Sequence, residues 1–300
     1  MGRVAPGPVR FGLVPLGSGR RAATGSIFAS MRNPLRTASS ALAGLVLAAP
    51  VVLGMAPASA APRQPVVYDA LGDSYASGYG VPPYTGGACG RSGSAYAEQL
   101  DGRMKIDLDD FVACAGATTT SMVAGGQLNA LDSDTDLVTL TIGGNDIGWS
   151  SAVGACLGGS DQQCAGALAL VRNRVLTQLP GLLDTVYTDV AAHAPAAHVV
   201  VTGYPRLFSP EYGPFLGASP AEQQALNDGA DTLNGVIVAA AARHGFQFVD
   251  VTKRFVGHGV NAPDPWILGP FDPAAFHPTL DGYRAYTAAL TAAIVPARLR

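Results

Sequence analysis

The stretch from Val66 to Gly78 constrains the fold more than any other part of this chain. Its first half is apolar and rich in β-branched residues, which is typical of a buried strand, and it ends abruptly in Gly72-Asp73-Ser74. A serine at the carboxyl end of a strand lies at the edge where open α/β sheets bind their ligands. Ser74 is therefore a candidate nucleophile, provided that other segments supply a base and an oxyanion site.

The first sixty residues differ in composition from the rest of the chain. They contain six arginines and no acidic residue, and from Met31 a basic segment leads into the apolar run Ala41–Leu53 and then into Ala58-Ser59-Ala60. This order predicts a secretory signal peptide with a small-x-small cleavage site, which is removed to leave residues 61–300. Because the apolar run is short and interrupted by a proline, we expect no stable membrane anchor and an extracellular protein.

Residues 61–300 have the size of one α/β domain with a sizeable core. They keep thirteen basic residues against twenty-two acidic ones, a net charge of −9. A chain this acidic is a poor candidate for binding nucleic acid or anionic membrane surfaces. We expect a single domain that acts as a monomer.

All four cysteines lie in this domain, and an even number in an exported protein predicts two disulfides. Of the three possible pairings we favour Cys89–Cys114, which ties together loops flanking Ser74, with Cys156–Cys164, which closes a short glycine-rich loop. Neither pair has the Cys-x2-4-Cys spacing of a structural zinc site, so no metal is expected.

Strands and helices alternate along the domain. Five apolar segments predict strands, at residues 66–71, 108–114, 137–142, 198–203 and 246–250. Five others predict helices, at residues 94–100, 118–131, 162–193, 220–244 and 278–294. We expect Ser94 to cap the first helix and Pro180 to break the third. Because the strands are apolar without clean alternation, the pattern predicts a parallel sheet covered on both faces.

Three groups suited to acyl transfer follow the first three strands: Ser74, Gly116 and Asn145. The carboxyl edge of one sheet would bring them together. The backbone N–H groups of Ser74 and Gly116 and the side-chain amide of Asn145 can donate to the oxygen that becomes negative in a tetrahedral intermediate. Taken singly, Gly72 and Gly143-Gly144 are typical of strand-ending turns and Asn145-Asp146 of a helix cap, so only the convergence of these segments on one edge indicates a site.

A histidine must supply the base, and the chain contains five. His277 is favoured because Phe276-His-Pro-Thr279 directly precedes the last helix, at the same edge of the sheet as Ser74. His258 lies in a glycine-rich loop and stays open as an alternative. The remaining three lie at helix or strand ends and are typical of solvated or capping residues: His193, His198 and His244.

Taken in order, these segments resemble the four conserved blocks of the SGNH or GDSL hydrolase family, and most of all its secreted bacterial lipases and esterases. The blocks are Gly72-Asp73-Ser74-x-x-Ser77-Gly78, Gly116, Gly143-x-Asn145-Asp146 and His277-Pro278. The resemblance implies a flavodoxin-like, three-layer α/β/α fold without metal or cofactor. It also implies Ser74 as nucleophile and oxyanion donor, Gly116 and Asn145 as further oxyanion donors, and His277 as general base.

One position departs from the family pattern. An aspartate usually stands three residues before the histidine, whereas here that residue is Ala274, and the nearest acid, Asp272, is two positions too early. Some secreted members of the family orient the histidine with a main-chain carbonyl at this place. The residue that orients His277 is therefore either Ala274, through its carbonyl, or Asp272, and we favour the carbonyl.

The sequence thus predicts a secreted serine esterase or lipase that cleaves a carboxylic ester, of a small molecule or a lipid, through an acyl-enzyme on Ser74. A carbohydrate O-deacetylase is the alternative within the enzyme class, and a non-catalytic exported binding protein is the alternative outside it. A binding module would have no reason to keep Ser74, Asn145 and His277 together. Five loop aromatics are candidates for an acyl pocket: Tyr79, Tyr84, Phe208, Trp266 and Phe271.

Overall fold

The computed structural model describes residues 64–295 and Leu299. The expected signal peptide, residues 1–60, lies outside the described residues. Within the described part no helix is long and apolar enough to cross a membrane.

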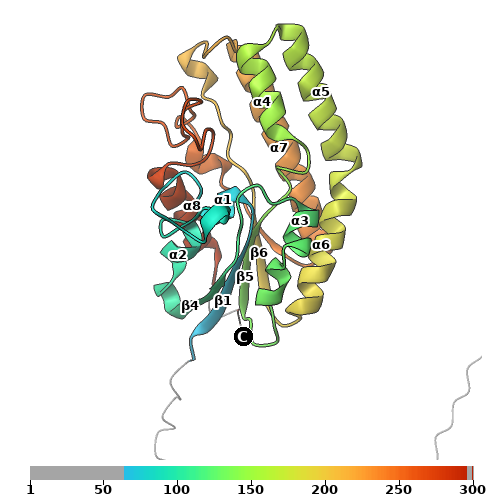
Figure 1. Cartoon of the computed structure of the whole chain (residues 1–300), viewed down its shortest axis with the longest axis vertical. Coiled ribbons are helices and arrows are strands. Elements are labelled where there is room, and N and C mark those ends of the chain that lie inside the picture. The colour runs from blue at the N-terminus through green and yellow to red at the C-terminus, as the bar shows by residue number, and fades with distance from the viewer. Residues whose placement is uncertain (1–63, 296–298, 300) are drawn as a thin grey trace, which may run out of the picture. The chain divides into compact units, whose positions relative to one another are not determined.

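A sheet of five parallel strands forms the centre of the domain (Figure 1). The strands lie in the order β4-β1-β5-β6-β7, which is the 2-1-3-4-5 order of flavodoxin-like folds. They are β1 (Val66–Gly72), β4 (Ile106–Phe111), β5 (Leu137–Thr141), β6 (His198–Thr202) and β7 (Gln247–Val249). Every residue of β5 is buried, as expected of a strand covered on both faces. The predicted fold class is therefore confirmed.

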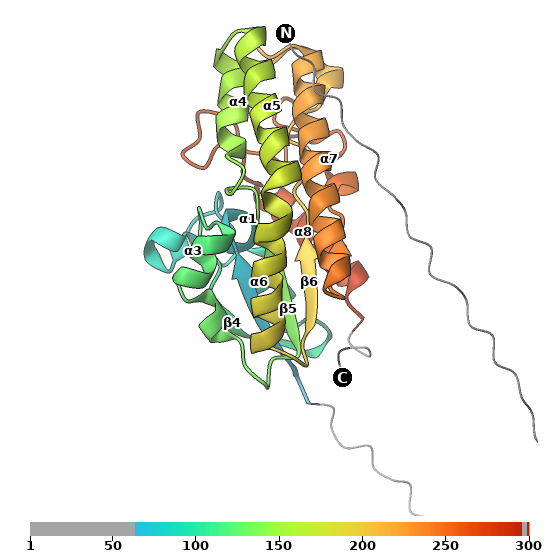
Figure 2. The ribbon, with the colours of Figure 1, turned by 90° about the vertical axis from the view of Figure 1, so that its right-hand side faces the viewer.

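Helices cover both faces of this sheet (Figures 1 and 2). One face carries α2 (Tyr96–Leu100) and α8 (Leu280–Ala293), and the other carries α3 (Thr119–Ala124), α6 (Leu179–His193) and α7 (Pro220–Arg243). The apolar stripe of α8 explains its packing, because Tyr283, Tyr286 and Leu290 are spaced on one helical face and have no exposed surface.

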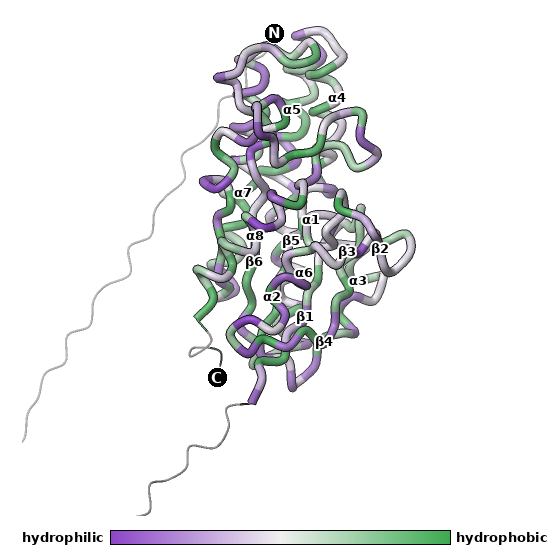
Figure 3. The backbone as a smooth tube through the Cα atoms, turned by 90° about the vertical axis from the view of Figure 1, so that its left-hand side faces the viewer, coloured by the Kyte–Doolittle hydropathy of each residue, from purple (hydrophilic) through white to green (hydrophobic). Residues whose placement is uncertain are grey.

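Two further helices, α4 (Trp149–Gly158) and α5 (Asp161–Thr177), pack with α7 beyond the carboxyl edge of the sheet (Figure 1). In Figure 3 hydrophobic and hydrophilic colours alternate along α5 and α7, as each helix turns between buried and exposed faces. The expectation that a glycine-rich loop closed by Cys156–Cys164 leads into the helix at residue 162 was wrong, because α4 and the first turn of α5 occupy most of that segment. The helix α4 forms because one of its faces is an apolar stripe of Trp149, Ala152, Val153 and Cys156. The small residues around this stripe hide it in the sequence.

Other helix boundaries also differ from the expected ones. The predicted helix at 162–193 is two helices that divide at Gln178, so the break expected near Pro180 is confirmed; Pro180 stands in the first turn of the second helix, where a missing N–H costs nothing. The predicted helix at 118–131 stops at Ala124, since Gly126 adopts a positive φ of 78° before a 3₁₀ turn. Ser94 is not the cap of α2: Ala95 is, while Ser94 donates its N–H to Ser92 Oγ.

Short elements complete the described chain. They are α1 (Ser74–Ser77), the hairpin strands β2 (Tyr84–Thr85) and β3 (Arg91–Ser92), and 3₁₀ turns at Gly87–Cys89, Arg103–Lys105, Gln127–Ala130, Pro210–Tyr212 and Thr252–Phe255.

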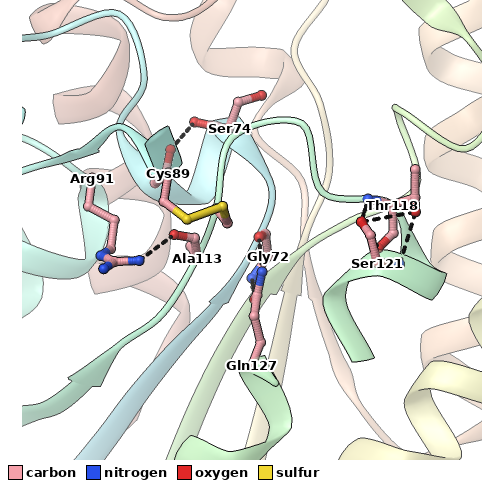
Figure 4. Close-up of a disulfide and its surroundings, with 10 residues drawn as sticks. Gly72, Ser74, Cys89, Arg91, Ala113, Thr118, Ser121 and Gln127 are labelled. Carbon is pink, nitrogen blue, oxygen red and sulfur yellow. Dashed lines mark hydrogen bonds between the residues drawn. A yellow bond between two sulfur atoms is a disulfide. The ribbon is translucent and has the colours of Figure 1, made fainter. Parts of the chain in front are cut away.

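Two disulfides join Cys89 to Cys114 and Cys156 to Cys164, which are the pairs favoured from the sequence. The first holds the loop after β4 against the loop after α1, close to the end of β1 (Figure 4). The second links α4 to the first turn of α5 across a short turn, instead of closing an irregular loop. The first disulfide therefore braces loops at the carboxyl edge of the sheet, and the second joins two helices that lie beyond it.

Candidate active site

Ser74 follows β1 directly and begins α1 at the point where β1 and β5 part, the switch point of the sheet. Gly72 allows this close approach, because its φ is 128° and a Cβ there would collide with the main chain of Thr141. The Asp73 carboxylate caps α1 by accepting the N–H of Tyr75 at 2.9 Å. These contacts fix the Ser74 hydroxyl at the sheet edge.

His277 reaches Ser74 from a position 203 residues later in the chain, with its Nε2 2.8 Å from Ser74 Oγ. The ring is flanked by Tyr75 and Tyr79, whose ring centres lie 5.3 and 5.1 Å from that of the imidazole. The preceding residue, Phe276, has a φ of 66°, which is unusual for a residue with a side chain, and its carbonyl accepts the Tyr75 hydroxyl at 2.6 Å. The strained backbone at Phe276 and the hydrogen bond from Tyr75 together orient the imidazole toward Ser74.

The other imidazole nitrogen, Nδ1, lies 3.0 Å from the Ala274 carbonyl and 3.1 Å from the Ala275 carbonyl. Because carbonyl oxygens only accept, Nδ1 carries the proton and Nε2 is left to accept from Ser74. The exposed Asp272 carboxylate accepts the N–H of Ala274 at 2.8 Å. Asp272 thus shapes the turn that presents the Ala274 carbonyl, and the geometry favours the carbonyl as the group that orients His277.

Burial lowers the pKa of His277, and the hydrogen bonds to the Ala274 and Ala275 carbonyls oppose that effect only in part. A lowered pKa keeps the imidazole neutral at neutral pH, as a general base must be.

Gly116 and Asn145 border the same cavity as Ser74 and His277. Asn145 Nδ2 donates to the Ala117 carbonyl at 2.9 Å, which fixes the plane of the amide. Since an amide nitrogen carries two hydrogens, a second one remains for a substrate oxygen. The next residue, Asp146, accepts both the N–H and the hydroxyl of Thr119 and so ties the Asn145 loop to α3.

Tyr204, just after β6, is a site residue that sequence reasoning missed. Its hydroxyl donates to the Asp73 carboxylate and accepts the N–H of Gly144 at 3.0 Å. It therefore bridges the neighbour of Ser74 to the neighbour of Asn145. Burial raises the pKa of Asp73 to about 7, and the Tyr204 hydrogen bond limits that rise. The sequence feature that could have identified Tyr204 is its position just after the fourth strand, at the sheet edge that also carries Ser74.

We expect Tyr204→Phe to lower kcat with little change in KM, because the ring stays while Gly144 and Asp73 each lose a partner. A buried group left without a partner typically costs about 1–3 kcal/mol. Steady-state kinetics and thermal unfolding measure the two effects, with Tyr212→Phe on an exposed tyrosine as the matched control. An unchanged kcat beside a lower melting temperature would limit Tyr204 to a structural role.

The cavity at the site has a volume of about 590 Å³. Away from Ser74 its wall is largely apolar and comes mainly from the helices beyond the sheet edge and from two loops: Trp149, Val153, Leu207, Leu233 and Phe276. None of these five residues was expected from the sequence to line an acyl pocket.

The expectation about loop aromatics was largely wrong, because Tyr79 borders this cavity whereas the other four pack or lie elsewhere. Tyr84 stacks on Tyr79, Phe208 packs against Phe215 and Phe276, Trp266 stacks on His258, and Phe271 is 89% exposed.

The remaining histidines have other partners. His193 Nδ1 lies 2.8 Å from the Asp189 carbonyl, His198 bonds Gln247, His244 bonds Asp184, and His258 Nδ1 lies 2.8 Å from the Asp264 carbonyl. His277 is the histidine that the structure brings to Ser74.

Comparison with known proteins agrees with this arrangement. The model of the GDSL-like lipase/acylhydrolase family matches residues 70–285. A lipase of Streptomyces rimosus is 38% identical over 252 residues, which cover 82% of this chain and 94% of that protein. Lipase 1 of Streptomyces coelicolor is 40% identical over 253 residues, covering 80% of this chain and 92% of that protein.

Solved structures give the same result. The crystal structure of an extracellular lipase from Streptomyces rimosus superposes with a TM-score of 0.72 at 37% identity, covering 76% of this chain and all of that one. The crystal structure of a phospholipase A1 from Streptomyces albidoflavus superposes with a TM-score of 0.73 at 37% identity, covering 77% of this chain and all of that one. The prediction of a carboxylic ester hydrolase of the lipase and esterase type is confirmed. The chain belongs to the GDSL-like lipase/acylhydrolase family.

Proposed function

We propose that this hydrolase acts on esters of medium and long acyl chains through an acyl-enzyme on Ser74. The observation that carries the proposal is the apolar cavity of about 590 Å³ that opens beside Ser74 and His277. Each methylene buried against such a wall contributes about 0.8 kcal/mol. An acetyl group would leave most of this wall in contact with water, which disfavours a carbohydrate O-deacetylase.

In the acylation step His277 Nε2 takes the proton of Ser74 Oγ, and Oγ attacks the ester carbonyl carbon. The carbonyl electron pair moves onto its oxygen, which the N–H groups of Ser74 and Gly116 and the Asn145 amide stabilise. Collapse of this intermediate breaks the bond to the alcohol oxygen, which leaves with the proton from Nε2. The Ala274 carbonyl, at 3.0 Å from Nδ1, holds the imidazolium in place meanwhile.

Deacylation repeats these steps with water as the nucleophile. His277 accepts a proton from water, the hydroxide attacks the acyl carbon, and the second intermediate expels Ser74 Oγ. The proton on Nε2 returns to Oγ, so the fatty acid leaves and the enzyme is regenerated without a cofactor.

A series of nitrophenyl esters from acetyl to palmitoyl tests the proposal, beside an acetylated sugar, a triglyceride and a phospholipid. We expect kcat/KM to rise at least about tenfold from acetyl to octanoyl, since each added methylene is worth about fourfold in an apolar site. Preference for the acetyl ester and the acetylated sugar would instead favour a deacetylase. Binding of the esters without turnover would favour a binding protein.

We expect Asp272→Asn to keep kcat/KM within about tenfold of the wild type. The carboxylate accepts the Ala274 N–H, an interaction that the asparagine oxygen can retain, and the imidazole is held by main-chain carbonyls. Steady-state kinetics on a nitrophenyl ester measure the change. A loss beyond about 10²-fold with unchanged thermal stability would replace the Ser74–His277 dyad by a triad that includes Asp272.

We also propose that residues 1–60 are removed on export and that residues 61–300 act outside the cell as a single, monomeric domain. The two disulfides support export, since such bonds persist in oxidising compartments. Similarity to the extracellular lipase from Streptomyces rimosus supports export as well. Mass spectrometry of the secreted, unreduced protein should give an N-terminus at Ala61 and both disulfides, and size-exclusion chromatography should give a monomer. A retained N-terminal segment would contradict the cleavage.

A further inference from the structure

A second cavity, of about 220 Å³, lies between α5 and α7. Its wall includes Leu168, Val171 and Val175 from α5 and Ala225 and Gly229 from α7. Trp149, the first residue of α4, is the one residue that lines both this cavity and the catalytic one. Figures 1 and 2 show the three helices side by side beyond the sheet edge.

The residues of α7 divide between the two cavities. Ala230 and Leu233 line the catalytic cavity, whereas Ala225 and Gly229 line the second one. The six-membered ring of the Trp149 indole lies directly against Gly229, where an added Cβ would come within 2.8 Å of its Cη2 and 2.9 Å of its Cζ3. The absence of a side chain at residue 229 is thus what lets the indole lie between the helices.

The chemistry of the second cavity suits an alkyl chain. Val171 and Val175 are buried and Leu168 is half-buried, so its inner wall is apolar. The charged side chains in its lining, Arg172 and Asp228, belong to residues that are exposed to solvent. An apolar interior with charges at the surface favours methylenes over a polar headgroup.

We propose that Trp149 determines the acyl-chain length that the enzyme accepts, because its indole separates the acyl cavity from the cavity between α5 and α7. Removal of the indole joins the two cavities, and the second then receives the distal methylenes of a long acyl chain. This inference rests on the proposed function, in which the acyl chain occupies the catalytic cavity.

The first test compares kcat/KM for nitrophenyl palmitate and nitrophenyl butanoate in Trp149→Ala and Trp149→Phe. We expect the palmitate-to-butanoate ratio to rise at least about tenfold in Trp149→Ala, since two further buried methylenes are worth about sixteenfold. Trp149→Phe should give a smaller rise and keeps an aromatic ring for packing. Adding Ala225→Phe to Trp149→Ala narrows the second cavity and should return the ratio toward the wild-type value.

Trp266→Ala is the matched control, because Trp266 stacks on His258 and belongs to the lining of neither cavity. We expect its ratio to equal that of the wild type. A wild-type ratio in Trp149→Ala, or a raised ratio that Ala225→Phe does not reverse, would overturn the proposal.

A second pair of variants acts through the indole without changing it. Gly229→Ala puts a methyl group against the ring, whereas Gly235→Ala, on the same helix, meets no atom within 4 Å. Both changes favour the helix, so both variants should fold. We expect Gly229→Ala to press the ring toward the catalytic cavity and lower the palmitate-to-butanoate ratio at least about threefold relative to Gly235→Ala. Equal ratios in the two variants would overturn the role of Trp149.

The outcome also separates this inference from the proposed function. If butanoate is hydrolysed and the wild type favours longer chains, an unchanged ratio in the Trp149 variants refutes only the role of the indole. If the wild type shows no rise with chain length, the proposed function itself fails.

Discussion

Ser74→Ala is expected to lower kcat by at least about 10³-fold while the protein keeps its fold. The Ser74 hydroxyl is the group that lies 2.8 Å from His277 Nε2, so its removal leaves the base without a nucleophile to activate. The oxyanion donors and the cavity remain, and they account for any residual hydrolysis above the uncatalysed rate. Ester hydrolysis under saturating substrate, together with thermal unfolding, measures both parts of the prediction.

Ser77→Ala is the matched control for this variant. Ser77 lies in the same short helix and is also buried, but its hydroxyl donates to the Ser74 carbonyl at 3.2 Å and points to no reacting atom. Its loss should cost less than tenfold in kcat. Near-normal turnover by folded Ser74→Ala protein would refute Ser74 as the nucleophile.

The central strands were predictable because a parallel strand buried on both faces leaves a continuous apolar run in the sequence, whereas the strand order was implied only by the family resemblance. β5 (Leu137–Thr141), for example, lies in the run 137–142, which is followed directly by Gly143 and Gly144. The edge strand β4 is partly exposed, and it lies at Ile106–Phe111 instead of the predicted 108–114. The helix α4 was not predictable in this way, since glycines and serines among its residues obscure the apolar stripe. As a result the helical wall of the cavity, including Trp149, was missed.

In the site, the residues that react with the ester or stabilise its oxyanion could be identified from the sequence, whereas Tyr204, which holds two of their neighbours, could not. Ser74 and His277 have chemical character that a sequence displays, and the sheet topology explains why they meet across 203 residues. The Ala274 carbonyl was favoured only through the family pattern, because every residue carries a carbonyl; the turn before His277 is what brings this one to 3.0 Å from Nδ1. Tyr204 gains its role from hydrogen bonds to Asp73 and Gly144, which follow β1 and β5, and these contacts depend on the pairing of β1, β5 and β6 in the sheet.

Asn145→Ala is expected to lower kcat by about 10²–10³-fold, or about 3–4 kcal/mol, with only a modest change in KM. The amide is held by the Ala117 carbonyl, so it is fixed in advance and costs no reorganisation when charge develops on the substrate oxygen. Two backbone donors would remain, at Ser74 and Gly116, and the variant should therefore stay more active than Ser74→Ala.

The affinity for a tetrahedral boronate or phosphonate analogue provides the sharper measurement, because it reports stabilisation of the transition state and not of the ester. It should weaken along with kcat in Asn145→Ala and stay unchanged in Asn129→Ala, where the same substitution falls on an exposed residue of a 3₁₀ turn. A variant that loses only KM, with kcat at the wild-type value, would show that Asn145 binds the ground-state ester. The oxyanion would then depend on the backbone N–H groups alone.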